Sequence, residues 1–363
     1  MITLICLTLE DYIKGVKKNY EVLAYRKIEK VYSYAFLSEL SPEYPMFSYN
    51  AMFMDGAISL EQPIKISQPF KILSLRELKR AKRYEGMDLE NSFVLSAVEA
   101  YLECGVLRKK MGILGKLSDN LDNLIKLSEY QYKGGDLRLS EAKVIRAKME
   151  LINAKIRKVE GDLRRVEEVV KFYYGGDVGE IFLPEVETLP NLDSLIKLLE
   201  NSPSLKYREH LKRSKRYENF SKILPLTLSP GILYHDRKFS FSLSIELPIW
   251  ILRYWGELNS SGEEYKMEEY MYRAERERRI AQIRGLYGDY TSSLESLKSL
   301  ENSLKEMEGA LNLERENYRS GRTNLYDIFM LYNEVLELEI EVVETKAEVL
   351  RKVYEIKGLV GIL

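Results

Sequence analysis

Apolar and polar positions follow two different periods along this chain. Leucines in the first half recur at spacings of 3, 4 and 3 residues, which is the pattern of a coiled-coil seam on a helix. The same spacing returns near the C-terminus. Residues 239–246 instead alternate apolar and polar without a break, which predicts a β-strand with one apolar face. The first seam comprises Leu114, Leu117, Leu121 and Leu124, and the second comprises Leu325, Ile328, Tyr332 and Val335.

Breaks in these patterns give the order of the predicted elements. Helices are expected over residues 9–39, 69–130, 137–172, 191–222, 250–317 and from the Gly321 turn to about 360. Strands are expected over residues 45–54, 57–65, 226–234 and 238–247. A helix of about 60 residues would be near 90 Å long, and no compact globular core needs such a helix.

A turn motif occurs twice, and the segments around it repeat in the same order. Tyr132, Gly135 and Glu141 match Tyr318, Gly321 and Asp327, each at an offset of 186 residues. Residues 59–64 match 244–249, residues 9–14 match 192–197, and Gly175 matches Gly361. We therefore predict repeat 1 over residues 9–188 and repeat 2 over residues 189–363, each with a helix, a β-hairpin and a long helical hairpin. Residues 1–8 are interpreted as the remnant of a signal peptide, with Cys6 as a lipid-anchored cysteine the alternative.

Composition excludes several classes of protein. Charged residues make up 31% of the chain but nearly cancel to a net charge of −1, which argues against a nucleic-acid partner. The two cysteines and two histidines are scattered, so no metal site and no cofactor are expected, and Cys104 is interpreted as a small buried hydrophobe. No nucleophile and base stand at a recognisable spacing, so an enzyme is not expected. No apolar run is long enough for a transmembrane helix.

The strands have the length and the alternation of membrane-spanning β-structure. Segments of nine or ten residues would cross a bilayer as tilted strands. Four strands cannot close a barrel, and open sheet edges in lipid would leave backbone groups without partners. Three chains would supply twelve strands and a closed pore. The alternative is a small soluble β-layer whose apolar face packs on helices. The polar face, which would line the barrel lumen, comprises Ser240, Ser242, Ser244 and Glu246.

The ordered set of motifs resembles the TolC-type outer-membrane efflux proteins. Each copy runs helix, hairpin, helix, Tyr-x-x-Gly turn and helix, and Pro63 and Pro248 each lead from a strand into a long helix. The Leu-Thr-Leu-Glu-Asp-Tyr segment at residues 7–12 is similar to mature N-termini of that family. The resemblance covers residues 7–361. It implies a mainly α fold with a small β part, in which duplicated long α-helical hairpins form a tunnel and four β-strands per chain contribute to a trimeric twelve-stranded transmembrane β-barrel.

The resemblance also implies a function, a location and partners. It implies the outer-membrane channel component of a tripartite efflux or type I secretion system, a passive exit duct without catalysis. The location implied is the outer membrane of a Gram-negative-type bacterium, with the helices extending into the periplasm. The implied partners are two further copies in a homotrimer, a periplasmic adaptor (membrane fusion) protein, an inner-membrane pump of the RND, ABC or MFS type, and outer-membrane lipid.

Residues of the second turn match the family's periplasmic gate. Asp327 lies six residues after Gly321, where the family carries its aperture aspartate, and three copies would form an electrostatic filter favouring cations. Some relatives have a second acid where this chain has Met330, so a hydrophobic tier is expected there.

The resemblance further implies a latch that holds the gate closed. Tyr318 and Glu141 fit the family's tyrosine and acid, whereas Thr323 occupies the usual arginine position and Arg322 stands one residue earlier. We therefore expect Tyr318 and Arg322 to bind Glu141.

The two turns are also the expected docking tip for the adaptor protein. The alternative treats the turn glycines as ordinary helix-terminating residues, and both interpretations can hold together. The tip comprises Tyr132, Gly134, Gly135, Arg319 and Gly321.

A soluble or periplasmic coiled-coil scaffold protein without channel activity is the alternative function. Such a scaffold would not need the strand pair with its alternating face. The strands therefore distinguish the two hypotheses.

Overall fold

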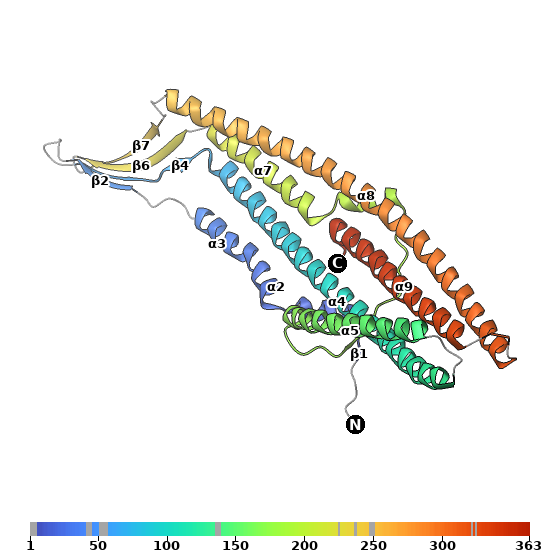
Figure 1. Cartoon of the computed structure of the whole chain (residues 1–363). Coiled ribbons are helices and arrows are strands. Elements are labelled where there is room, and N and C mark those ends of the chain that lie inside the picture. The colour runs from blue at the N-terminus through green and yellow to red at the C-terminus, as the bar shows by residue number, and fades with distance from the viewer. Residues whose placement is uncertain are drawn as a thin grey trace. The chain divides into compact units, whose positions relative to one another are not determined.

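The computed structural model describes residues 6–40, 46–50, 57–134, 139–223, 226–235, 238–246, 251–320, 322–323 and 325–363 (Figure 1). The helices within these ranges are α1 (Leu9–Val16), α2 (Tyr20–Tyr25), α3 (Ile28–Leu40), α4 (Gln68–Gly134), α5 (Leu139–Tyr174), α6 (Leu192–Leu199), α7 (Pro203–Ile223), α8 (Ile251–Arg319) and α9 (Leu325–Val360). The strands are β1 (Cys6–Leu7), β2 (Met46–Asn50), β3 (Ala57–Glu61), β4 (Ile64–Lys65), β5 (Glu180–Ile181), β6 (Thr227–His235) and β7 (Lys238–Glu246). No helix in these ranges is both long enough and apolar enough to cross a membrane.

The chain divides into two compact units, each assembled from separated segments. Unit 1 contains residues 1–22, 91–194 and 282–363, and unit 2 contains residues 23–90 and 195–281. Each unit therefore takes segments from both predicted repeats, and the long helices α4 and α8 each contribute to both units.

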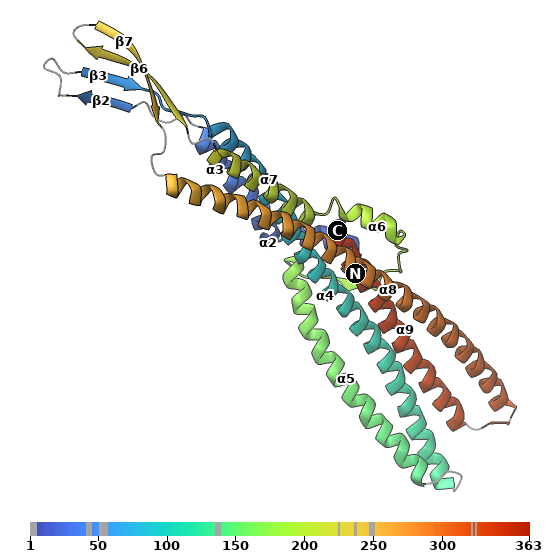
Figure 2. The ribbon, with the colours of Figure 1, turned by 90° about the horizontal axis from the view of Figure 1, so that it is seen from above.

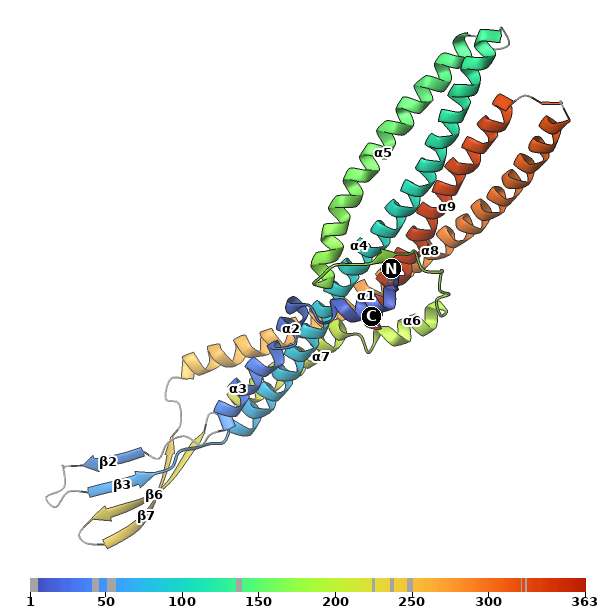
Figure 3. The same ribbon diagram turned by 90° about the horizontal axis from the view of Figure 1, so that it is seen from below.

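In unit 1, segments of α4, α5, α8 and α9 lie side by side (Figure 3). Leu114, Leu117 and Leu121 of α4 are buried and contact Ile152 of α5 and Leu336 of α9. The predicted seam on α4 is thus confirmed at these three leucines, while the side chain of Leu124 lies outside the described residues. On α9, the buried Ile328 and Val335 contact Leu311 of α8, and Tyr332 packs against the same cluster. The side chain of Leu325 lies outside the described residues.

The single helix predicted over residues 9–39 is wrong, because the chain forms α1, α2 and α3 there. The first break is made by Asn19, a polar residue whose amide donates to the carbonyl oxygens of Phe172 and Tyr173 at 3.0 and 3.1 Å. Its Oδ1 accepts from the backbone N–H of Glu21 at 3.0 Å and so satisfies the start of α2. Asn19 thereby caps two helix ends at once.

The helix predicted over residues 191–222 is also interrupted, giving α6 and α7 in its place. Pro203 is the first residue of α7, where its missing N–H costs no hydrogen bond and its fixed φ suits the helix. The segment predicted as one strand over residues 57–65 is divided into β3 and β4.

Unit 2 carries an antiparallel sheet with the strand order β2, β3, β6 and β7, visible side by side in Figure 2. Strand β4 pairs with the part of β6 that β3 does not reach. The predicted strands over residues 226–234 and 238–247 are confirmed as β6 and β7 within one residue. Within the described residues, β2 and β7 have a partner on one edge only.

Candidate functional site

One face of the sheet in unit 2 is apolar and open to solvent. The pairing register places Phe241 of β7 beside Ile232 of β6, and Ile232 beside Leu60 of β3, so the three residues share a face. Phe241 is 94% exposed, and Ile232 and Leu60 are nearly half exposed. The same face continues along β7 in the exposed residues Phe239, Leu243 and Ile245. The interpretation of a soluble β-layer requires helices to cover this apolar face. These described side chains are exposed instead.

The opposite face of the sheet is polar. Ser244 of β7 donates from its hydroxyl to Oε2 of Glu61 on β3 at 3.3 Å, although β6 lies between these two strands. Ser240 donates to the carbonyl oxygen of Leu233 at 3.4 Å. The hydroxyls of Ser229 and Ser242 are buried and have no hydrogen-bond partner among the described residues. The predicted polar positions Ser240, Ser242 and Ser244 thus share this face, whereas the side chain of Glu246 lies outside the described residues.

Gly231 makes the contact between β3 and β7 possible. It stands on β6, paired with Glu61 on one side and Ser242 on the other. A Cβ atom at this position would lie 2.7 Å from Cγ of Glu61 and 2.8 Å from Oγ of Ser242. Glycine is therefore required here because the neighbouring side chains extend across β6.

A second candidate site lies in unit 1, where α8 ends and α9 begins. The backbone N–H of Arg322 donates to the carbonyl oxygen of Asn317 at 2.9 Å, which closes the last turn of α8 in the manner of a Schellman motif. The hydroxyl of Ser320 donates to the same carbonyl oxygen at 2.8 Å. Tyr318 and Arg319 are exposed at this end of the helix.

Asp327 lies in the first turn of α9 and is exposed. The positive end of the helix dipole favours a carboxylate at this position. The hydroxyl of Thr323 lies 3.5 Å from Oδ2 of Asp327. Hydrogen bonds from Thr323 and from Asn317 lower the pKa of the nearby Glu314 carboxyl. The lowered pKa favours the ionised form of the Glu314 carboxyl near the end of α8.

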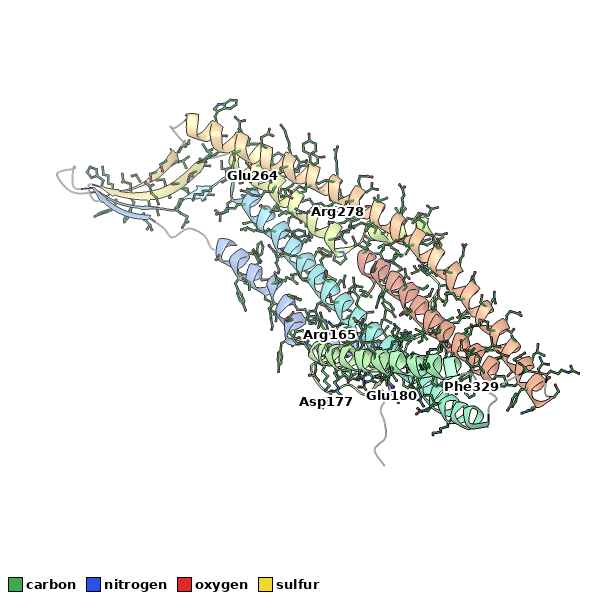
Figure 4. The ribbon with its side chains drawn as sticks, viewed as in Figure 1. Arg165, Asp177, Glu180, Glu264, Arg278 and Phe329 are labelled. Carbon is green, nitrogen blue, oxygen red and sulfur yellow. The ribbon has the colours of Figure 1, made fainter. Side chains whose placement is uncertain are left out.

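One turn further along α9, Met330 lies against α5. Its sulfur accepts from Nζ of Lys148 at 3.3 Å. Both residues line a cavity of about 180 Å³ between α4, α5 and α9, together with Leu117, Leu121, Ile152 and Asn333. Phe329, labelled in Figure 4, packs against the same apolar cluster. Met330 thus borders a cavity that apolar residues line together with Lys148, Glu334 and Glu337.

Figures 2 and 3 place the C-terminal ends of α4 and α8 at the same end of unit 1, next to the starts of α5 and α9. Gly134 is the last residue of α4. Gly135 and Gly321 lie outside the described residues, as do the side chains of Tyr132 and Glu141. The pairing of Tyr318 and Arg322 with Glu141 therefore stays a prediction.

Two residues of these sites were missed from the sequence. Glu61 lies within the repeated segment 59–64 and aligns there with Glu246, which is a signal for the serine face. Lys148 carries no sequence signal of its own, because its contact with Met330 depends on how α5 packs against α9.

No family model matches the chain, and no curated protein matches it. Solved structures do. The outer-membrane channel OprN has a TM-score of 0.80 and 13% identity, with 97% of this chain and 89% of that chain covered. The outer membrane protein VceC of Vibrio cholerae has a TM-score of 0.77 and 12% identity, covering 97% and 96%. The open state of the MtrE outer membrane channel of Neisseria gonorrhoeae has a TM-score of 0.74 and 12% identity, covering 97% and 88%.

At these identities the comparisons establish the fold. The chain has the fold of TolC-type outer-membrane efflux channels over nearly its whole length. The resemblance predicted from the repeated hairpins and the Tyr-x-x-Gly turns is confirmed at this level.

Proposed function

We propose that this protein is the outer-membrane channel component of a tripartite efflux or type I secretion system, acting as a passive trimeric exit duct. The sheet carries this proposal. Its apolar face, with Phe241 94% exposed, suits the hydrocarbon of a bilayer, and its serine face suits a water-filled lumen. The fold that the chain shares with outer-membrane channels supports the same proposal independently.

The two open edges of the sheet support the proposed trimer. Because each neighbouring pair among β2, β3, β6 and β7 is antiparallel, β2 and β7 run in opposite directions. The β7 strand of one copy can therefore pair with the β2 strand of the next in the antiparallel manner of outer-membrane barrels. Three copies close a barrel of twelve strands and leave no edge in the lipid.

The proposal includes a location and partners, as the resemblance implies. The barrel would lie in the outer membrane of a Gram-negative-type bacterium, with the helical hairpins in the periplasm. The turns between α4 and α5 and between α8 and α9 would meet a periplasmic adaptor protein, and an inner-membrane pump would supply the substrate.

The start of α9 is the proposed gate. Three copies of Asp327 around an axis would hold negative charge at the entrance and favour cations. Met330, one turn further along α9, would form an apolar tier of the gate. Lys148, whose Nζ donates to the sulfur of Met330, would add a positive charge beside this tier. MtrE, which shares the fold, has been solved in an open state, so a channel of this kind can adopt more than one state.

The latch of Tyr318 and Arg322 on Glu141 is part of this proposal. Tyr318→Phe and Glu141→Ala are expected to raise single-channel conductance in planar bilayers, because each removes a bond that holds the tip closed. Tyr326→Phe, two residues into α9, is the matched control and should leave conductance unchanged. Unchanged conductance in both latch variants would contradict the latch.

Membrane fractionation tests the proposed function as a whole. The full chain is expected in the outer-membrane fraction, to run as a trimer that dissociates on heating, and to conduct ions in planar bilayers. A monomer that is soluble without detergent would overturn the channel proposal and favour the coiled-coil scaffold.

A further inference from the structure

We propose that Glu61 forms a second cation-selective ring inside the barrel, separate from the proposed ring of Asp327 at the helical tips. This inference rests on the proposed trimeric channel and names a residue that determines its ion selectivity. The position of Glu61 on β3, its contact with Ser244 and the glycine beside it carry the argument.

Glu61 is on the face of the sheet that would line the lumen. In the register it pairs with Gly231, which pairs with Ser242, so all three lie in one row on the serine face. The apolar face, with Phe241 and Leu243 exposed, is the one that lipid would cover. A carboxylate in this row is therefore directed to water and away from lipid.

The carboxylate of Glu61 is held in place by its surroundings. Oε2 accepts the hydroxyl proton of Ser244 at 3.3 Å, which fixes the side chain across β6. Gly231 leaves the space for this crossing, because any side chain there would meet Cγ of Glu61. An acid that lay on the sheet only to be solvated would need neither the glycine nor the serine of the third strand.

Two serine hydroxyls lie beside Glu61 on the same polar face of the sheet. Ser229 and Ser242 flank Gly231 on the same face, and their buried hydroxyl oxygens have no protein partner among the described residues. A cation passing this row would meet the Glu61 carboxylate of each of three copies. Rings of carboxylates are a common device for selecting cations in channels.

Ion selectivity measured in planar bilayers tests the proposal. The full-length trimer is compared in the Asp327→Asn background with and without Glu61→Gln, so that the tip carboxylate cannot dominate the result. Glutamine keeps the size of the side chain and can still accept from Ser244. The K⁺ to Cl⁻ permeability ratio is expected to fall by about threefold or more, and the fall should shrink at high salt because of screening.

A rescue variant separates charge from structure. Ser242→Asp, added to Glu61→Gln and Asp327→Asn, returns a carboxylate to the same row and is expected to restore the permeability ratio. Channels whose ratio does not change on Glu61→Gln would overturn the inference and leave the channel proposal intact. A wild-type protein that forms no channels would overturn both.

Discussion

At the scale of single residues, unit 1 holds a buried cluster of titratable side chains. Tyr12 is fully buried, and its ring lies 5.1 Å from the ring of Tyr101 and stacks on Tyr174 at 5.9 Å. The hydroxyl of Tyr101 donates to the carbonyl oxygen of Leu7 at 2.7 Å. Burial raises the pKa of Tyr101 to about 12 and that of the Cys104 thiol to about 11. The interpretation of Cys104 as a small buried hydrophobe is confirmed, because its side chain has no exposed surface.

The raised pKa of Cys104 predicts that its thiol reacts slowly with disulfide reagents. In a Cys6→Ser variant, reaction of Cys104 with a disulfide reagent at pH 8 should be at least about a hundredfold slower in the folded protein than in guanidinium, since the pKa rises from 9.0 to about 11. Because the folded pKa is the higher one, the stability that the neutral thiol contributes is complete below pH 9 and is lost as the pH rises through 11. Equal rates in both states would contradict the buried thiol.

At the scale of elements, unit 2 is held together by a buried polar contact between α4 and α7. Nδ1 of His210 lies 2.6 Å from Oε2 of Glu77, and both side chains are about nine-tenths buried. Arg80 donates to the other oxygen of Glu77 at 2.7 Å, and the ring of Tyr84 stacks on His210. Glu77 therefore has a basic partner on each oxygen, as a buried carboxylate requires.

Removing Glu77 should weaken this contact strongly. Glu77→Ala leaves the buried imidazole of His210 without its hydrogen-bond partner, and we expect the free energy of unfolding to fall by about 1–3 kcal/mol. Thermal unfolding of the purified protein in detergent measures this as a lowered Tm. The control is Glu263→Ala on α8, where the carboxylate is 73% exposed and should contribute nothing measurable. Equal Tm values for the two variants would contradict the structural role of Glu77.

The long helices and the hairpin strands could be predicted because their signals are periodic. The leucine spacing on α4 indicates which face of the helix is buried, and the serine alternation on β7 indicates which face of the strand is polar. Neither signal depends on which residues pack against that face. The break at Asn19 could not be found in this way. An asparagine within a polar stretch is compatible with a helix. The break after α1 depends on the hydrogen bonds that Asn19 donates to two carbonyl oxygens near the C-terminal end of α5, which is distant in the sequence.

Short elements and contacts between helices escaped prediction for a related reason. Strands β1 and β5 have two residues each, so neither shows an alternation, and they pair in parallel although β1 precedes the first repeat and β5 lies near its end. Pro203 gives an ambiguous signal in the sequence. A proline can occupy the first position of a new helix or interrupt a helix, and the residue type alone does not distinguish the two cases. Lys148 and Met330 are brought together only by the packing of α5 against α9.

At the scale of the whole molecule, the two faces of the sheet set the environment that the protein requires. A soluble protein rarely exposes a continuous apolar surface spanning several strands. Here Phe241, Ile232 and Leu60 continue such a surface across β7, β6 and β3. The serines of the opposite face exclude burial of both faces in lipid. The closed barrel of the proposed function, with lipid outside and water inside, would satisfy both faces and both open edges of the described sheet at once.

A matched pair of arginine substitutions on β7 tests this assignment, because neighbouring residues of a strand point to opposite faces. Phe241→Arg would place a charge on the lipid face at a cost of about 2–4 kcal/mol per chain near the bilayer midplane. We expect this variant to be depleted from the outer-membrane fraction and to lose the heat-dissociable trimer. Ser240→Arg carries the same charge one residue away on the lumen face, so it should insert and assemble normally. Equal loss of both variants, or normal insertion of Phe241→Arg, would contradict the assignment of the two faces.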